Sequence, residues 1–332
     1  MMVVRSTRKQ GESAMTMQDL TSKTARLIAE IETVIVGKRQ SVRLTVAGLL
    51  CGGHILIEDI PGVGKTMLAR SLAKALDCTF RRIQFTPDLL PADVIGVSIY
   101  NQGTMQFEFR PGPIFANIVL ADEINRATPK AQAAMLECME ESTITVDGIT
   151  HELPQPFFVI ATENPIEYEG TYSLPEAQLD RFLMRVSLGY PSPADEVDIL
   201  SRQVKVHPIH RVKPVLTAAE LVELQAAVRD VHVDDSLKEY AVNLVDRSRS
   251  HPSVELGASP RGSLALMRCG QAIAAIGGRD FVTPDDIKSV AHTVLGHRII
   301  VKPDQRIRGI GSEQVVGDIL RSVAVPVLAE TV

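Results

Sequence analysis

The chain has no tryptophan, and aromatic side chains make up only 4% of its 332 residues. Proteins that bind single-stranded nucleic acid stack its bases on such side chains, so this scarcity disfavours that class of protein. Positive charge is not in excess either, because the formal net charge is −5 at pH 7. A broad basic face for nucleic acid is therefore not expected, although a local basic patch is compatible with this charge balance.

Long apolar runs and closely spaced cysteines are also missing. No stretch approaches the roughly 18 apolar residues of a membrane span, so we expect none. The N-terminal residues are polar and have no apolar core region, which predicts a flexible tail over residues 1–18 rather than a secretory signal. Four cysteines lie far apart without metal-ligand spacing, which is typical of reduced thiols in a cytoplasmic protein: Cys51, Cys78, Cys138 and Cys269.

The most informative segment runs from residue 55 to residue 66 and reads ILIEDIPGVGKT. An apolar run ends in a glycine-rich turn, and Gly-Lys-Thr closes the turn before a helical pattern. This order predicts a phosphate-binding loop, whose backbone N–H groups and helix N-terminus face an anion. We expect the Lys65 ammonium to reach the terminal phosphates of a nucleotide and the Thr66 hydroxyl to bind Mg²⁺. The residues expected to line the nucleotide here are Pro61, Gly62, Val63, Gly64, Lys65, Thr66 and Met67.

One position departs from the strict motif G-x-x-x-x-G-K-[ST], because Asp59 stands where the first glycine belongs. Glycine is required only where φ is positive or where another group approaches the backbone closely. Position 59 lies at the end of the expected strand, before the turn, and Gly62 and Gly64 still supply the permissive positions. We therefore expect nucleotide binding to survive this departure.

Between residues 19 and 190, short apolar runs alternate with helical patterns. The runs at 55–57, 118–121 and 157–161 are β-rich and bounded by turn signals, as buried parallel strands are. Alternating strands and helices imply a parallel sheet with helices on both faces. The expected fold class is therefore α/β, with an αβα nucleotide-binding domain over residues 19–190.

Two insertions interrupt this domain, and a second domain follows it. Residues 88–113 are rich in proline and glycine and predict a helix broken by a β-hairpin or a loop. Residues 142–153 predict a hairpin, because Asp-Gly separates two alternating runs. Residues 191–215 form a connector that begins with a helix and then becomes irregular. Helix-capping patterns then predict a small all-helical lid domain over residues 216–332.

Polar side chains follow two of the expected strands. Asp122 and Glu123 end the run 118–121; we expect Asp122 to bind Mg²⁺ and Glu123 to orient or deprotonate the attacking water. Asn164 follows the run 157–161, at the edge where open α/β sheets bind ligands, and is a candidate for holding the γ-phosphate or that water. Taken alone, Asp-Glu also marks a strand that reaches the surface, and Asn-Pro also marks a turn. The preceding phosphate loop favours the catalytic interpretation.

Two arginines complete the candidate set. Arginine stabilises charge on a transferring phosphoryl group and is in some enzymes donated by a neighbouring subunit, which makes Arg181 a candidate. A solvated helix arginine is the alternative interpretation of the same residue. Arg261 lies in the first turn of an expected lid helix, where the helix dipole disfavours a cation. We therefore expect Arg261 to face an anion and to couple the nucleotide state to the lid.

Together these residues resemble an AAA+ ATPase and, more narrowly, a member of the MoxR family. The resemblance runs from about residue 30 to about residue 300. Its further motifs are Val36-Gly37, GHILIE at 53–58, RPGPIF at 110–115, DEINRA at 122–127, ATENP at 161–165, LPEAQLDRF at 174–182 and SPR at 259–261.

The resemblance implies a role for each candidate. It also implies that backbone near Ile35 to Gly37, including Val36, contacts adenine. The insertions would correspond to the helix-2 insert and the pre-sensor hairpin, and the connector would reposition the lid. The implied roles are Walker A for Lys65 and Thr66, Walker B for Asp122 and Glu123, sensor 1 for Asn164, an arginine finger acting in trans for Arg181, and sensor 2 for Arg261.

The same resemblance implies the cofactors and partners. The nucleotide would be ATP with Mg²⁺, and the assembly would be a homo-oligomer in the form of a hexameric ring. Members of the family are thought to act as chaperones that remodel, mature or activate protein complexes, often with a von Willebrand A-domain partner. We therefore expect an ATPase with a protein client.

Three other functions remain open at this point. The motor subunit of a metal chelatase would share the ring architecture and differ mainly in its client. A nucleic-acid motor would share the hairpin insertions, but the negative net charge is against it, and the local basic run between Arg202 and Lys213 also fits a solvated connector. A nucleotide-gated scaffold without turnover is disfavoured because the chain has both Glu123 and Arg181.

Overall fold

The computed structural model describes residues 15–165 and 171–326. Its core is a five-stranded parallel sheet with the strand order β2-β5-β8-β1-β9. Since all of these strands run the same way, their carboxyl ends meet at one edge of the sheet. The parallel sheet predicted from the sequence is confirmed. Its strands are β1 (Ile55–Glu58), β2 (Phe80–Gln84), β5 (Ile118–Asp122), β8 (Phe158–Glu163) and β9 (Met184–Val186).

Helices cover both faces of the sheet, because alternate residues of each central strand point to opposite sides. Ile55 and Ile57 of β1 belong to the core shared with α1, α2 and α3, whereas Leu56 belongs to the core shared with α4 and α5. This burial on both faces explains why the central strands read as continuous apolar runs. The helices are α1 (Met17–Glu32), α2 (Arg39–Leu50) and α3 (Lys65–Ala75) in one layer, with α4 (Pro91–Ile95) and α5 (Pro129–Glu141) in the other.

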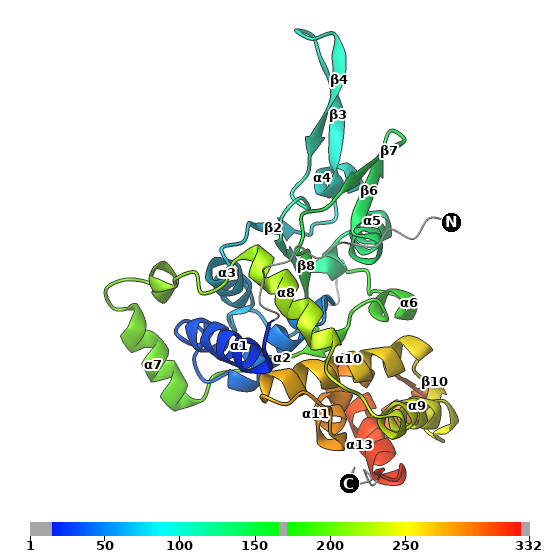
Figure 1. Ribbon diagram of the computed structural model, residues 1–332. Helices are drawn as coiled ribbons and strands as arrows, with labels where there is room; N and C mark the ends of the chain where they lie inside the picture. The colour runs from blue at the N-terminus through cyan, green and yellow to red at the C-terminus, as the bar shows by residue number, and fades with distance from the viewer. Residues whose placement is uncertain (1–14, 166–170, 327–332) are drawn as a thin grey trace, which may run out of the picture.

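Two antiparallel hairpins extend from this core. After α4, strands β3 (Gly96–Asn101) and β4 (Gln106–Pro111) form an arm that stands clear of the sheet at the top of Figure 1. The second hairpin pairs β6 (Thr143–Val146) with β7 (Ile149–Glu152). Its turn residues Asp147 and Gly148 both have positive φ, as the predicted two-residue Asp-Gly turn requires. We call the β3/β4 pair the hairpin arm.

The chain after β9 is predominantly helical, and no helix of the described residues is long and apolar enough to cross a bilayer. The prediction of an all-helical region is wrong in one detail, because β10 (Val254–Leu256) and β11 (Ile300–Val301) pair antiparallel within it. Strands of two or three residues have no periodicity to detect. The helices are α7 (Pro193–Gln203), α8 (Ala218–Arg229), α9 (Asp235–Ser250), α10 (Pro260–Ile276), α11 (Pro284–Leu295), α12 (Pro303–Ile307) and α13 (Ser312–Ser322), with the 3₁₀ turn η2 (Pro208–Arg211).

The expected N-terminal tail is too long. Helix α1 begins at Met17, and Thr16 and Asp19 cap it reciprocally through side chain and backbone, so residues 15–18 belong to the start of this helix. Residues 1–14 lie outside the described residues.

The sequence pattern does not predict the edge strands β2 and β9. Strand β2 reads FRRIQ and buries only Ile83, so it shows no apolar run.

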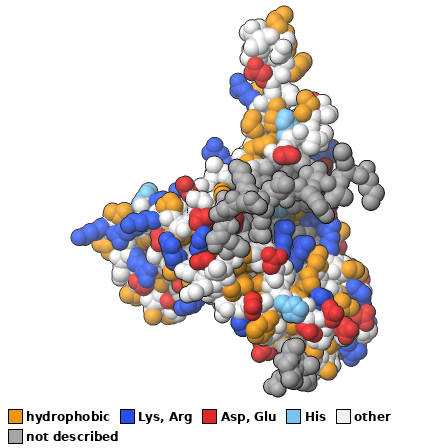
Figure 2. All heavy atoms as spheres, viewed as in Figure 1, with side chains coloured by type: hydrophobic (Ala, Val, Ile, Leu, Met, Phe, Trp, Pro, Cys, Tyr) orange, Lys and Arg blue, Asp and Glu red, His pale blue; other side chains and the backbone are white. Residues whose placement is uncertain are grey.

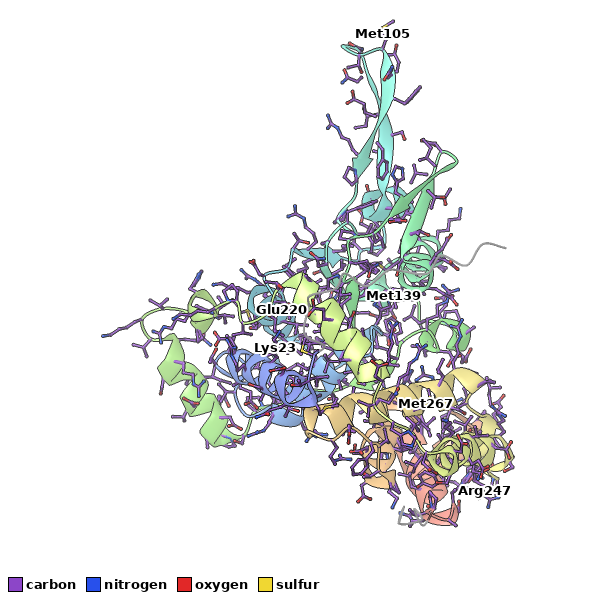
Figure 3. All side chains as sticks on the ribbon, in the orientation of Figure 1. Lys23, Met105, Met139, Glu220, Arg247 and Met267 are labelled. Atoms are coloured by element: carbon purple, nitrogen blue, oxygen red, sulfur yellow. The ribbon has the colours of Figure 1, made fainter. Side chains whose placement is uncertain are left out.

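Polar contacts join the helical region to the core on two sides of it, among others. Arg298, which is only 8% exposed, donates from Nε to Asp180 Oδ1 at 2.8 Å and from Nη2 to the Phe182 carbonyl at 2.6 Å. On the other side, Lys23 of α1 and Glu220 of α8 form an ion pair of 2.9 Å (Figure 3). A buried guanidinium without its carboxylate would be costly, so the Arg298 contacts specify where the helical region sits.

A buried histidine ties three elements of the core together. His54, directly before β1, accepts the Val159 N–H at Nδ1 (3.0 Å), and its Nε2 lies 2.9 Å from the Met139 carbonyl at the end of α5. Since Nδ1 accepts, the proton of the neutral ring sits on Nε2. Burial lowers the pKa of His54 from the usual 6.5 of a histidine to about 4. His54 is therefore neutral in the folded protein.

This histidine should make stability fall as pH falls. The unfolded chain takes up a proton on His54 near pH 6.5, whereas the folded chain resists it down to about pH 4. Stability is therefore complete above the unfolded pKa and is lost below it, by about 2 kcal/mol between pH 7 and pH 5. Urea unfolding at both pH values checks this against His54→Gln, which should lose that much less than the wild type. Equal losses in the two proteins would contradict the assignment.

Candidate active site

The turn after β1 has the backbone geometry of a phosphate-binding loop. Gly62 and Gly64 have φ values of +86° and +98°, which glycine adopts at little cost. Helix α3 starts at Lys65, and no side chain caps its N-terminus among the described residues. Its first N–H groups are therefore left for another acceptor, such as a phosphate. Asp59 does not have a positive φ, so position 59 needs no glycine on conformational grounds.

A cavity of about 330 Å³ lies over this turn and collects most of the predicted residues. Its walls come from the loop and the start of α3, from the strand ends of β2 and β5, and from the residue after β8. The lining residues are Pro61, Gly62, Gly64, Lys65, Thr66, Met67, Arg82, Asp122, Glu123 and Asn164.

Asp122, at the end of β5, is buried and held from two sides. Its Oδ1 accepts the Thr162 hydroxyl at 2.7 Å, and its Oδ2 accepts Arg82 Nε at 2.8 Å. Together with the Thr66 hydroxyl, which lines the same cavity, this carboxylate offers the hard oxygen ligands that Mg²⁺ prefers. The residues present therefore fit a magnesium site.

Glu123 occupies an unusual backbone conformation. Its φ of +58° places it in the left-handed region, which is costly for a residue with a Cβ and tends to occur at functional sites. The Glu123 N–H donates to the Thr162 hydroxyl at 2.9 Å, and Gln84 Nε2 donates to the Glu123 carboxylate at 2.6 Å. Arg126 lies 3.2 Å from the same carboxylate. These contacts fix Glu123 at the cavity wall.

Three residues of this site are not predicted by the sequence pattern, namely Arg82, Gln84 and Thr162. Arg82 and Gln84 lie on the edge strand β2, whose alternate exposed positions carry no apolar signal. Thr162 lies inside the predicted ATENP motif but was not singled out. The available signal is that Thr162 lies near the end of a buried strand, two residues before Asn164, and alternate residues of a strand point to the same face.

A second cavity, of about 180 Å³, adjoins the first and has apolar walls. It shares Gly62, Gly64 and Met67 with the phosphate cavity, and Val36 and Val63 line it as the sequence suggests. Gly37, where φ is +71°, packs closely on α7, because a Cβ at this position would lie 2.3 Å from the Asp195 carboxylate. The expected backbone contact between this segment and adenine stays a prediction. Further walls come from Val34, Ile35, Lys38, Pro191, Ile199, Gln203, His207 and Pro208.

Arg181 and Arg261 do not line either of these cavities. Both instead contact the Glu140 carboxylate at the end of α5: Arg181 Nη2 lies 3.3 Å from it, and Arg261 forms an ion pair with it. Asp180 adds a link to the lid, because its Oδ2 accepts the hydroxyl of Ser259, the N-cap of α10, at 2.7 Å. The structure thus places both arginines together, Arg181 from the chain that follows α6 (Glu176–Leu179) and Arg261 from α10, and neither lines the phosphate cavity of its own chain.

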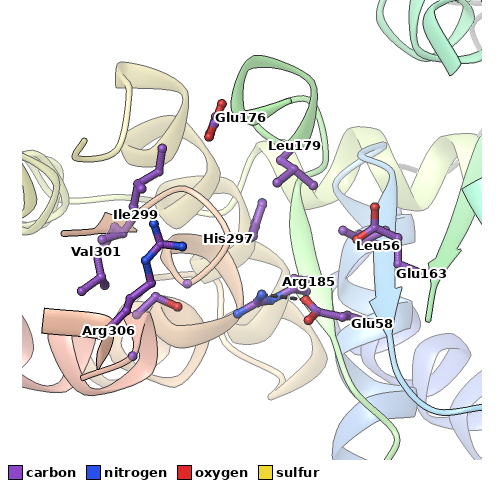
Figure 4. A pocket seen from close by; sticks show the side chains of 14 residues that line it. Leu56, Glu58, Glu163, Glu176, Leu179, Arg185, His297, Ile299, Val301 and Arg306 are labelled. Carbon is purple, nitrogen blue, oxygen red and sulfur yellow. Dashed lines mark hydrogen bonds and ion pairs between the residues drawn. The ribbon is translucent and has the colours of Figure 1, made fainter. Parts of the chain in front are cut away.

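Glu163 lines a third cavity, on the other side of β8 from Asn164. This cavity lies between the sheet edge and the helical region (Figure 4) and includes Glu58 and Arg185, whose Nη1 donates to Glu58 at 2.7 Å. Burial, and secondarily the Glu58 charge, raises the pKa of Glu163 to about 7. The alternation of strand β8 therefore turns Glu163 away from the phosphate cavity that Asn164 lines.

A parallel sheet, a glycine turn before the N-terminus of α3, and two carboxylates at the end of β5 define an ATPase fold with a helical lid. Comparison with known proteins agrees. Residues 54–184 match the family model described as ATPase family associated with various cellular activities (AAA), and residues 246–319 match the AAA lid domain.

Several relatives narrow this class. The chain is 55% identical to the uncharacterized protein YeaC of Bacillus subtilis over 93% of this chain and 97% of that protein. It is 42% identical to chaperone MoxR1 of Mycobacterium tuberculosis over 91% of this chain and 82% of that protein. Magnesium-chelatase subunit ChlI-1 of Arabidopsis thaliana is more distant, at 26% identity over 70% of this chain and 53% of that protein. The chain belongs to the MoxR family of AAA+ ATPases.

A solved structure supports the same conclusion. The crystal structure of a protein assigned as an ATPase from Cytophaga hutchinsonii has a TM-score of 0.88 and 39% identity, and the match covers 94% of this chain and 97% of that chain. The αβα core and the lid of this chain therefore have a close structural counterpart.

The Thr162 hydroxyl should matter for hydrolysis although it does not line the cavity. In Thr162→Val, Asp122 loses a donor and the Glu123 N–H loses its acceptor, so we expect ATPase turnover to fall by roughly tenfold or more. Thr162→Ser keeps the hydroxyl and should stay close to the wild type. Steady-state rates measured over a range of Mg²⁺ concentrations check this; a valine variant as active as the serine variant would contradict it.

Proposed function

We propose that this chain hydrolyses ATP to remodel, mature or activate protein complexes, as a homo-oligomer whose active sites are completed by neighbouring copies. The observation that carries this proposal is the position of Arg181 and Arg261. The two guanidinium groups lie on one carboxylate, Glu140, and outside the phosphate cavity of their own chain. An arginine that stabilises charge on a transferring phosphate is effective only beside it.

Within one chain, the phosphate cavity supplies the remaining groups. The uncapped start of α3 and the Lys65 ammonium bind the phosphates. Mg²⁺, held by Thr66 and Asp122, neutralises phosphate charge when bound. Glu123 orients and deprotonates the attacking water, and Asn164, which lines the same cavity, holds that water or the γ-phosphate. The apolar second cavity takes the adenine ring between Val36 and Val63.

The missing arginines come from the next copy in the ring. A contact between the arginine side of one copy and the cavity side of the next is heterologous, and repeating it gives a ring when the rotation between copies closes. We propose a hexamer, in line with the family resemblance. In this arrangement Arg181 is the finger acting in trans, and Arg261, held beside it through Ser259 and Asp180, reports the same neighbouring nucleotide to the lid.

The hairpin arm is the proposed contact with the client. Met105 and Phe107 at its end are 72% and 74% exposed, and hydrophobic side chains reach the far end of the arm in Figure 2. Phe109 instead stacks on His151 of β7 at a ring distance of 4.1 Å, which braces the arm against the second hairpin. Exposed apolar side chains on a braced arm are suited to bind the surface of a client protein. As a partner distinct from the client, we propose a von Willebrand A-domain protein in the cytoplasm.

A metal-chelatase motor is the second candidate function. It is favoured only by the shared ring architecture, and its relatives are the more distant ones. A nucleic-acid motor has less support, since the net charge is −5 and the exposed end of the arm is apolar rather than basic.

Glu123→Gln should bind ATP but hydrolyse it slowly. The amide keeps the size of the side chain and loses the base, so we expect turnover to fall by about 100-fold or more. Equilibrium binding of ATP and steady-state hydrolysis measured on the same preparation separate the two effects. Hydrolysis at the wild-type rate would refute the role of Glu123 as the base. The ATP-bound variant is also the form in which a client should be captured.

Mixing two inactive variants tests whether Arg181 acts in trans. Arg181→Ala alone should lose at least about 100-fold in turnover, because its sites lack the finger. In mixed rings with Glu123→Gln, some sites combine an intact Glu123 with an intact Arg181 from the neighbour, so activity should reappear on mixing. If the finger acted within its own chain, no mixed site would be complete and the mixture would stay inactive.

A further inference from the structure

The Asp59 carboxylate accepts four hydrogen bonds. This side chain is buried, and its Oδ2 accepts the Leu188 N–H at 2.6 Å, the Gly189 N–H at 2.7 Å and the Ser187 hydroxyl at 3.1 Å. The other oxygen, Oδ1, accepts the Ile60 N–H at 3.0 Å. Hydrogen bonds from N–H groups to an ionised carboxylate are among the stronger ones in proteins. A glycine at this position would supply none of them.

The backbone of Asp59 is engaged at the same time. Its carbonyl accepts Lys65 Nζ at 2.5 Å, and its N–H donates to the Glu163 carbonyl at 3.2 Å. One residue therefore touches the lysine of the phosphate loop, the strand that precedes Asn164, and the chain that leaves β9.

The segment that Asp59 holds, residues 187–189, leads directly to the second cavity, in which the adenine base is proposed to bind. The Ser187 carbonyl accepts the Ser41 hydroxyl at 2.8 Å, and the Tyr190 carbonyl accepts Lys38 Nζ at 2.6 Å. Pro191 and Ile199 of α7 follow, and they line the apolar cavity opposite Val36. Residues 187–190 are thus held between Asp59, at the end of β1, and the start of α2.

We infer that Asp59 is a positioning residue that fixes the base-side wall of the nucleotide site relative to the phosphate loop. Without its carboxylate, the Leu188 and Gly189 amides lose their acceptor, and α7 is no longer held at a set distance from Gly62 and Gly64. Binding of the adenosine part of the nucleotide then becomes weaker, whereas the loop that binds the phosphates keeps its own glycines. This inference rests on the proposed function, that these cavities bind ATP.

The experiment compares two ligands on the full-length chain by calorimetry in the presence of Mg²⁺. In Asp59→Gly, which restores the strict loop motif, the Kd for ATP should rise by about tenfold, while the Kd for inorganic triphosphate should stay unchanged. Asp59→Asn keeps one acceptor but turns an N–H group toward the Ile60 N–H, so its effect should be intermediate. Hydrogen exchange of the 187–190 amides should be faster in both variants, with or without nucleotide.

Asp286→Asn is the matched control. Asp286 is also a buried carboxylate that accepts a backbone N–H, that of Thr283 at 2.8 Å, and its partner Arg279 lies in the lid. This variant should unfold more easily yet bind ATP as the wild type does.

The possible results distinguish a failure of the positioning role from a failure of the proposed function. Equal losses for ATP and triphosphate, or no loss of either, would overturn the inference. A wild type that binds no ATP would refute the proposed function instead, and unchanged exchange of the 187–190 amides would then overturn the positioning role as well.

Discussion

The buried contact between Arg298 and Asp180 decides how the two parts of this chain lie. Arg298 comes from the helical region and Asp180 from the core, directly before Arg181. Ser259, which caps the helix that carries Arg261, donates to the same carboxylate. Separating the buried Arg298 guanidinium from the Asp180 carboxylate would leave an uncompensated charge, so this contact favours one arrangement of the helical region on the core. Both arginines are consequently held on one side of the chain, and the phosphate cavity lies on another.

The central part of the fold could be predicted because its signals are local. The strands β1, β5 and β8 are buried on both faces and therefore read as short apolar runs. The phosphate loop needs positive φ at two positions, and these positions are glycines. Asp122 and Asn164 could be identified because each stands at the end of a predicted strand. Each of these features is visible within a few residues of sequence.

The remaining features depend on contacts between distant parts of the chain. Arg82 reaches Asp122 because β2 pairs with β5, and the sequence pattern contains no information on strand order. Asp59 meets Leu188 because β9 pairs with β1, at a separation of 129 residues. The same applies to Glu140, whose two arginine partners come from different regions. Such side chains look like ordinary surface charges until the topology is known.

The shared carboxylate of Glu140 has a thermodynamic consequence. Two guanidinium groups with one carboxylate form a cluster of net positive charge, and the bound nucleotide of a neighbour is strongly negative. On the proposed function, ATP therefore binds more tightly to assembled copies than to separate ones. Reciprocity of linked equilibria then requires ATP to strengthen assembly by the same factor. The cellular ratio of ATP to ADP would in this way control not only the rate of the motor but also how much of it exists as a ring.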